Sequence, residues 1–244
     1  MATVLIVAGS DSSGGAGIAR DVATVAKAGG EAALALTAVT VQTHRAVEAI
    51  EAMPPALVAA QMRAAFDSGP VGAVKIGMLA NGPILVAVAD VLAAHAEVPV
   101  VLDPVLAASA GGALLSEEAM MLLRQVLLPR VTLVTPNLPE LARLTGTAEI
   151  ADVETGRAAA MMLNPAGAVL VKGGHAAGDT ADDLLLRPGL PDIVFRAARS
   201  GARLRGTGCM LSSGIAARLA LGDALETAIR GAKAQVTARF ADAA

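Results

Sequence analysis

The sequence predicts an α/β protein, a three-layer α/β/α sandwich around a central, mostly parallel sheet. Short runs rich in Val and Ile alternate with amphipathic stretches along most of the 244 residues. Hydrophobic residues make up 55% of the chain and aromatic residues 1%, with no Trp or Tyr, so the core must be aliphatic, as suits buried parallel strands. No repeat, low-complexity tract or linker divides the chain, and residues 1–244 are predicted to form one domain.

Six apolar runs are predicted to be buried strands, and stretches with helical spacing lie between and after them. The strands are expected at 3–8, 33–41, 71–76, 98–102, 131–135 and 167–171. The helices are expected at 15–29, 55–68, 81–95, 116–128, 137–145 and 153–163. Strand–helix–strand units with right-handed crossovers give a parallel sheet, whose ligands bind beyond the carboxyl ends of the strands.

The pattern changes after residue 172. A run at 183–186, a turn at Pro188-Gly189 and a second run at 193–195 predict an antiparallel hairpin. Two final helices are expected near 207–220 and 223–241.

Charge and composition exclude several classes of partner. The net charge is −3 without a long basic run, so the footprint of a nucleic-acid binder is missing. No apolar stretch of about 18 residues is free of Gly, Pro and charge, and the first residues lack the basic region of a signal peptide. We therefore expect a soluble, cytoplasmic protein without a membrane partner. The single cysteine, Cys209, excludes an internal disulfide and a multi-cysteine metal site.

A glycine-rich turn leads directly into the helix predicted at 207–220. Gly206 and Gly208 allow the backbone to approach a ligand closely, so that several N–H groups point at one place. The positive end of the helix dipole favours an anion there, and Cys209 lies in the first turn. These features predict a phosphoryl-transfer site. For a GTG tripeptide alone, a turn that only starts a core helix would be the better interpretation, and it is a second glycine loop that favours the functional one.

A second glycine loop follows the first strand, from Gly9 to Gly17. Its spacing fits neither a P-loop, which needs a lysine after the second glycine, nor a dinucleotide fingerprint. We interpret it as one wall of a small-molecule site, where the glycines let the substrate approach the backbone closely. Asp21 lies one helical turn further on. The alternative for Asp21 is a solvated carboxylate at the start of a helix.

Three polar side chains end or follow other strands. Asp103 and Glu140 are carboxylates of the kind that Mg²⁺ prefers, usually together with water and substrate phosphates. Lys172 ends a strand and could reach a transferred phosphate, although such a lysine can also be a surface residue. Asn137 precedes Glu140 and by itself favours a helix cap.

Two further residues fit the recognition of a heterocycle. Gln42 ends an apolar strand and offers both a donor and an acceptor, and Met78 offers a polarizable wall for a ring. A loop amide and a core methionine are the plain alternatives. The three histidines, His44, His95 and His175, lack metal-ligand spacing.

The order of these motifs resembles the hydroxymethylpyrimidine / phosphomethylpyrimidine kinases of thiamine biosynthesis, in the ribokinase-like superfamily. The resemblance covers nearly the whole chain and implies ATP with Mg²⁺ as phosphoryl donor. The acceptor it implies is a hydroxymethyl aminopyrimidine or its monophosphate. The motifs that carry it are Val7–Ile18 with Asp21, Lys75–Leu79, Leu102–Val105, Thr135–Glu140, Lys172–His175 and Gly206–Cys209.

The resemblance also implies roles for single residues. It places a pyrimidine pocket at Gly9, Asp21, Gln42, Met78 and Val105. ATP and phosphoryl transfer would involve Asn137, Glu140, Lys172, Gly206, Thr207, Gly208 and Cys209, and the metal would be held by Asp103 and Glu140. The thiol of Cys209 would accept the acceptor's proton, with a pKa lowered from about 8.5 at the helix start. We also expect a homodimer, although the sequence alone does not fix the oligomeric state.

The chain departs from the family pattern in three places. Arg205 stands where the family often has histidine, Met210 where it often has threonine, and Thr43-His44 where it more often has Asn-Thr. Arg205, with Arg199 and Arg203, could meet phosphate or form a solvated cluster. The departures leave open whether one or both phosphates are added. Two alternative functions also remain: a pyridoxal kinase and a non-catalytic pyrimidine sensor. An NAD-dependent oxidoreductase is disfavoured by the glycine spacings.

Overall fold

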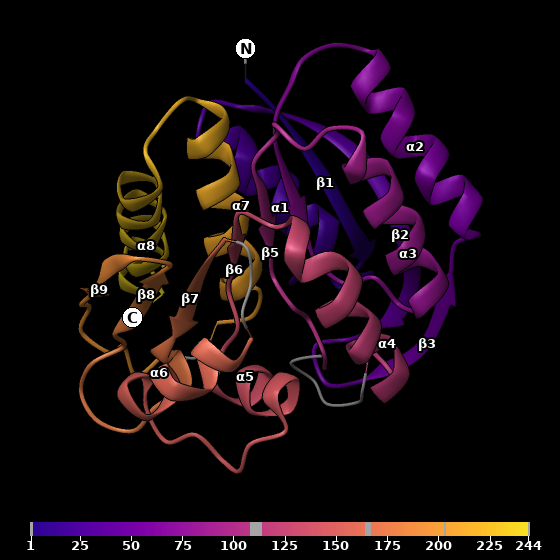
Figure 1. The fold of residues 1–244 in the computed structure, drawn as a ribbon. Coiled ribbons are helices and arrows are strands. Elements are labelled where there is room, and N and C mark those ends of the chain that lie inside the picture. The colour runs from indigo at the N-terminus through magenta and orange to yellow at the C-terminus, as the bar shows by residue number, and fades with distance from the viewer. Residues whose placement is uncertain (1, 108–113, 164–166, 203, 244) are drawn as a thin grey trace.

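A single mixed sheet forms the centre of the computed structural model, which describes residues 2–107, 114–163, 167–202 and 204–243 (Figure 1). Nine strands within these residues lie in the order β3-β2-β1-β4-β5-β6-β7-β8-β9. The six strands from β2 through β7 in this order are parallel, and β3, β8 and β9 are antiparallel to their neighbours. The bounds are β1 Thr3–Ser10, β2 Glu31–Gln42, β3 Val47–Ala52, β4 Val71–Ile76, β5 Val100–Leu102, β6 Leu133–Val134, β7 Ala168–Lys172, β8 Asp183–Arg187 and β9 Leu190–Phe195.

Helices cover both faces of the sheet and complete the predicted three layers. One face carries α1 (Gly17–Lys27), α7 (Thr207–Ala220) and α8 (Leu225–Ala241). The other carries α2 (Pro55–Asp67), α3 (Gly82–Ala93), α4 (Glu117–Leu122), α5 (Leu138–Thr145) and α6 (Val153–Met162).

The strand β1 illustrates why the sheet is buried on both sides. Val4, Ile6 and Ala8 belong to the core under α1, α7 and α8, whereas Leu5 and Val7 belong to the core on the opposite face. Because successive side chains of a strand point to opposite faces, an uninterrupted apolar run fills both cores at once.

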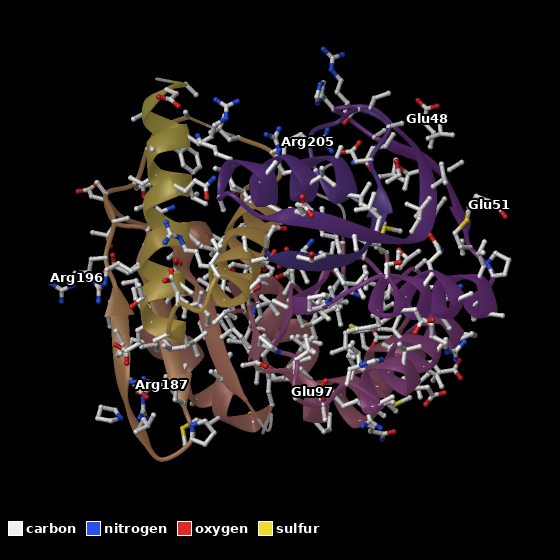
Figure 2. All side chains as sticks on the ribbon, turned by 90° about the horizontal axis from the view of Figure 1, so that it is seen from above. Glu48, Glu51, Glu97, Arg187, Arg196 and Arg205 are labelled. Atoms are coloured by element: carbon white, nitrogen blue, oxygen red, sulfur yellow. The ribbon has the colours of Figure 1, made fainter. Side chains whose placement is uncertain are left out.

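Charged side chains lie mainly at the margin of the molecule. Figure 2 shows Glu48, Glu51 and Arg196 projecting outward from the ribbon, and all three are exposed. None of the helices in the described segments has the length and apolarity that a membrane span requires.

The expected elements are present, with two differences. β3 was not predicted, because Val47–Ala52 contains two glutamates and lacks the apolar run of a buried strand; it forms an exposed edge that pairs with β2 alone. The single helix expected at 116–128 is divided into α4, a π turn at Leu123–Leu127 and a 3-10 turn at Leu128–Arg130. Pro129 supplies no N–H, which is consistent with the end of regular α-helix there.

The strand order places a crevice at the carboxyl end of β1. The chain leaves β1 to form β2 on one side and later returns to form β4 on the other side. Connections on opposite faces of the sheet separate at such a point, and ligands of open α/β sheets bind there. The loop from Asp11 to Ala16 and the segment Gly77-Met78 border this crevice.

Candidate active site

A buried ion pair lies at the carboxyl edge of the sheet. Lys172, the last residue of β7, places Nζ 2.7 Å from Oδ1 of Asp103, which follows β5. The same Nζ lies 3.7 Å from Oε2 of Glu140. Asp103 is 2% exposed and Lys172 9% exposed. The surface alternative for Lys172 is therefore wrong: the structure brings all three predicted residues together.

Glu140 also caps the helix on which it lies. Its Oε2 accepts a hydrogen bond of 2.8 Å from the amide of Asn137, and Oδ1 of Asn137 accepts one of 2.8 Å from the amide of Glu140. The cap expected at Asn137 is thus confirmed as a reciprocal capping box. Burial raises the pKa of Glu140 to about 7, against the opposing attraction of Lys172. Its charge therefore depends on what binds beside it.

The amino terminus of α7 lies directly against this ion pair. A Cβ built on Gly208 would lie 3.3 Å from Nζ of Lys172 and 3.4 Å from Oδ2 of Asp103. Gly206 has φ 72° and closely approaches the carbonyl oxygen of Gly15, so a side chain there would be both strained and obstructed. The two glycines let the free N–H groups of the helix start meet the sheet edge.

A second buried ion pair lies below the first glycine loop. Oδ2 of Asp21 is 2.6 Å from Nζ of Lys75, and Ser213 donates a hydrogen bond of 2.5 Å to Oδ1. Asp21 and Lys75 are both 0% exposed, so the solvated alternative for Asp21 is wrong. Burial by itself lowers the pKa of Lys75, but the acidic groups around it, Asp21 foremost, together more than offset this effect and the pKa is raised.

The sequence analysis named Lys75 only as part of the Lys75–Leu79 motif, without a role, and it did not name Ser213. Lysine is rarely buried unless it is paired, and Lys75 stands in an otherwise ordinary strand, β4. A charged residue inside an apolar run of a central strand was the available signal. Its partner, 54 residues away, becomes evident only in the fold.

The environment of Cys209 corrects one expectation. Burial raises the pKa of its thiol to about 11, and the nearby Lys75 lowers it only in part. The expectation of a pKa lowered at the helix start is therefore wrong, because desolvation of the thiolate exceeds the favourable effect of that position. At neutral pH the group is a neutral thiol.

The residues expected around a pyrimidine lie near the crevice. A Cβ on Gly9 would lie 3.1 Å from Sδ of Met78, whose carbonyl accepts a hydrogen bond from Thr37. Gln42 is partly buried and is held through its backbone by the hydroxyl of Ser12 at 2.8–2.9 Å. Val105 is partly buried and follows Asp103 by two residues, with its amide donating to the carbonyl of Asp103.

The arginines before α7 have different surroundings. Arg199 donates to carbonyl oxygens of Gly173, Gly174, Gly178 and Thr180, which fixes the loop after β7. Arg205 lies 3.3 Å from Asp11 and 3.0 Å from Ser13 and from His44. Arg199 and Arg205 therefore do not form the solvated cluster that was one of the two alternatives. Arg203 lies outside the described residues.

Comparison with known proteins places this geometry in one family. The family model described as phosphomethylpyrimidine kinase matches residues 11–244. A hydroxymethylpyrimidine/phosphomethylpyrimidine kinase of Streptomyces coelicolor is 44% identical over 96% of this chain and 87% of its own length. A thiamine biosynthesis bifunctional protein of Geobacter sulfurreducens is 45% identical over 97% of this chain, which spans about half (48%) of that longer relative.

Solved structures share the fold over the full chain. The phosphomethylpyrimidine kinase of Clostridium difficile 630 has a TM-score of 0.84 and 33% identity, covering 98% of this chain and 100% of its own. The pyridoxal kinase of Bacillus subtilis, solved as an ADP complex, has a TM-score of 0.86 and 30% identity over 96% of this chain and 89% of its own.

The buried pair below the glycine loop makes a prediction about stability. Replacing Lys75 by Met would leave Asp21 buried without its cation and should lower the free energy of unfolding by about 3–5 kcal/mol. Urea denaturation measures this loss. Combining Lys75→Met with Asp21→Asn should restore part of it, and Lys27→Met, at the end of α1, serves as the control. A Lys75→Met protein as stable as the wild type would contradict the proposed pairing energy.

The raised pKa of Cys209 predicts slow alkylation. Because the chain has one cysteine, iodoacetamide labelling reports on this thiol alone. With a pKa of about 11, the rate constant should still rise about tenfold per pH unit between pH 8 and 10. The urea-unfolded chain should level off above about pH 9, and circular dichroism verifies that the native protein stays folded. A plateau by pH 9 in the folded protein would show that burial does not hold the thiol neutral.

Proposed function

We propose that this chain, which belongs to the phosphomethylpyrimidine kinase family, phosphorylates a hydroxymethyl aminopyrimidine, its monophosphate, or both. The chain is a kinase, and a phosphotransferase with a ribokinase-like fold. The observation that carries the residue assignment is the close approach of the α7 amino terminus to the buried Asp103–Lys172 pair. This juxtaposition unites free backbone donors, a fixed cation and carboxylates at one edge of the sheet.

The transfer itself needs positioning more than a strong base. The acceptor oxygen forms a bond to the γ-phosphorus of ATP while the bond from that phosphorus to the β–γ bridging oxygen breaks, and ADP leaves with the bonding electrons. Lys172 and the N–H groups from Thr207 to Cys209 would balance the charge on the phosphoryl oxygens. In a loose transition state the acceptor hydroxyl loses its proton late, to an oxygen of the transferred phosphoryl group, so a neutral Cys209 thiol need only orient that hydroxyl.

The carboxylates of this edge fit a magnesium ion that is shared with the nucleotide. Asp103 and Glu140 supply hard oxygen donors, and no cluster of three or more potential ligand side chains occurs in the segments that the structure describes. Mg²⁺ characteristically keeps several waters and uses one or two carboxylates together with substrate phosphates. When bound, it would neutralise phosphate charge, with Glu140 ionised beside it.

The acceptor pocket is assigned to the crevice. Gly9 allows close approach, Met78 offers a wall for the ring, and Val105 closes the side next to Asp103. Gln42 would pair with ring or amino nitrogens through its side-chain amide. Both oxygens of Asp21 are already engaged by Lys75 and Ser213, so Asp21 would shape the pocket rather than contact the ring directly.

The apolar edge of the sheet supports a homodimer. Val39 and Val41 of β2 are 43% and 54% exposed, and Leu34 and Ile50 are 46% and 39% exposed. Val39 and Val41 lie on the same face of β2, whereas Ile50 pairs with Thr40 and points to the other face. The exposed valines of β2 therefore favour association with a second copy of the chain.

A mass-spectrometric assay tests the kinase proposal. Wild-type protein with Mg-ATP should add phosphate to the aminopyrimidine alcohol or its monophosphate faster than to pyridoxal. Lys172→Met should lower kcat by about 10²–10³-fold, because the fixed cation at the phosphoryl group is lost. Lys27→Met, far from the sheet edge, is the matched control, and circular dichroism monitors folding. Preference for pyridoxal would overturn the acceptor assignment, and unchanged turnover in Lys172→Met would overturn the assigned role of Lys172.

Light scattering after gel filtration tests the homodimer. Val41→Glu should convert the dimer to a monomer because a charge would be buried in the interface. Met161→Glu, which changes a 62% exposed residue of α6, should leave the dimer intact. A monomeric wild-type protein, or a dimer that persists in Val41→Glu, would exclude this interface.

A further inference from the structure

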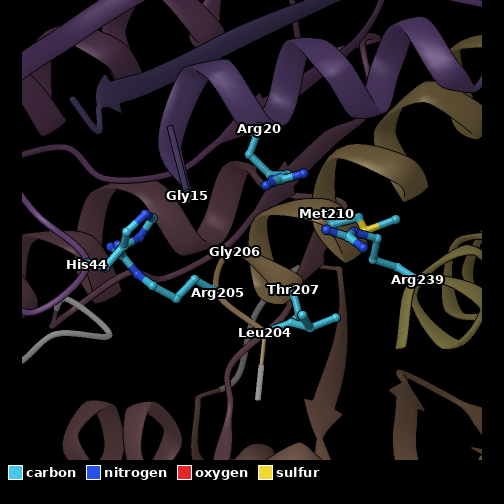
Figure 3. A pocket seen from close by; sticks show the side chains of 9 residues that line it. All are labelled: Gly15, Arg20, His44, Leu204, Arg205, Gly206, Thr207, Met210 and Arg239. Carbon is cyan, nitrogen blue, oxygen red and sulfur yellow. The ribbon is translucent and has the colours of Figure 1, made fainter. Parts of the chain in front are cut away.

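A cavity of about 320 Å³ opens on the side of α7 that faces away from the sheet edge. It lies between α1, α8 and the segment that leads into α7 (Figure 3). Its lining includes Arg20, Arg205, Thr207, Met210 and Arg239 but none of Asp103, Glu140, Lys172 or Cys209. The cavity is therefore distinct from the Asp103–Lys172 pair, although it shares Gly206 and Thr207 with the candidate transfer site and Gly15 with the first glycine loop.

The cavity carries an excess of positive charge. Figure 3 shows the guanidinium groups of Arg20 and Arg239, from two different helices, at the same end of the cavity over Met210. Neither forms an ion pair with any carboxylate of the described segments. Two unneutralised cations in one cavity repel each other. An anion bound between them would be attracted to both, and this attraction would offset their mutual repulsion.

Unused donors accompany this charge. Nε of Arg20 and Nε of Arg205 are buried and have no hydrogen-bond partner. A buried donor without an acceptor costs free energy comparable to a lost hydrogen bond. Thr207, the first residue of the 14-residue helix α7, adds the positive end of the helix dipole. The helix dipole and the guanidinium groups without an ion pair favour acceptor oxygens within the cavity, whereas the two buried Nε atoms are not exposed to it.

Three departures from the family pattern meet here. Arg205 and Met210 line the cavity, and so does His44 from the Thr43-His44 pair. Arg205 places Nη1 3.0 Å from Nδ1 of His44 and 3.3 Å from the carbonyl oxygen of Thr43. Lining residues that stand up to 166 positions apart in the sequence thus build one wall.

We propose that this cavity is a second anion site, which binds the phosphate group of a small phosphorylated molecule. Arginine is suited to phosphate because its planar donors match the phosphate oxygens. The volume exceeds that needed for phosphate alone and lies at the lower end of the range for small-molecule pockets. The side chain of Met210 offers an apolar surface for the remainder of the molecule. The inference does not depend on which acceptor the kinase uses.

Calorimetric titration tests the site with inorganic phosphate and with glycerol 2-phosphate as probes. Saturating Mg²⁺ and a non-hydrolysable ATP analogue occupy the transfer site throughout, so that the binding measured arises elsewhere. Wild-type protein should bind both probes, and glycerol 2-phosphate at least as tightly as inorganic phosphate. Arg20→Gln and Arg239→Gln should each weaken binding by about tenfold or more.

Arg230→Gln is the matched control because this exposed arginine also lies on α8 but stacks over Phe195 outside the cavity. Its affinity for both probes should equal that of the wild type. Circular dichroism and thermal melting verify that the variants are folded. The proposal is overturned if the nucleotide analogue abolishes binding, if Arg230→Gln loses as much affinity as Arg239→Gln, or if chloride at equal ionic strength gives the same heat.

Discussion

The close approach of the α7 amino terminus to the carboxyl edge of the sheet is the constraint on which the site depends. It requires glycine at two positions: Gly206, which has a positive φ and approaches the carbonyl of Gly15, and Gly208, which faces the Asp103–Lys172 pair. A side chain at position 206 would push the start of α7 away from the first glycine loop, and one at position 208 would push it away from the edge of the sheet. The backbone donors of the helix start and the buried cation are therefore held together because these two positions carry no side chain.

Buried charge is the second feature that organises this edge. Lys75 and Lys172 both pair with aspartates in nearly complete burial, at 2.6 Å and 2.7 Å. Such pairs contribute little net stability over apolar packing, but removing one partner is costly, so they fix geometry more than they strengthen the fold. Their electrostatic influence extends to Cys209: burial is the main reason that the pKa of its thiol rises, Lys75 lowers that pKa, and Asp21 and Asp103 raise it further.

The sequence predicted the parts of the fold that depend on local pattern. Apolar runs located the six parallel strands, and the GTG turn located α7 at its observed bounds, Thr207–Ala220. β3 was missed because its stability comes from pairing with β2 rather than from its own apolar content. Lys75 was missed for a similar reason: burial of a lysine is favourable only with Asp21 beside it, and that proximity is a property of the tertiary structure. The pKa of Cys209 likewise follows from burial, which the helix start alone did not indicate.

Departures from a family pattern acquire meaning only through their location. Arg205 and Met210 stand far from His44 in the sequence. In the fold they line one cavity with Arg20 and Arg239. The unbalanced positive charge there comes from Arg20 and Arg239, which form no ion pair in the described segments, whereas Arg205 is paired with Asp11. Because Gly206 and Thr207 border both regions, an anion in the cavity and a phosphoryl group at the sheet edge would lie on two sides of the same helix start. Two anions near one helix dipole compete for the same positive potential, and occupancy of one site would then weaken the other unless the arginines compensate. Arg20 and Arg239 form no ion pair in the described segments, so an anion in the cavity would be attracted by these cations as well as by the helix dipole.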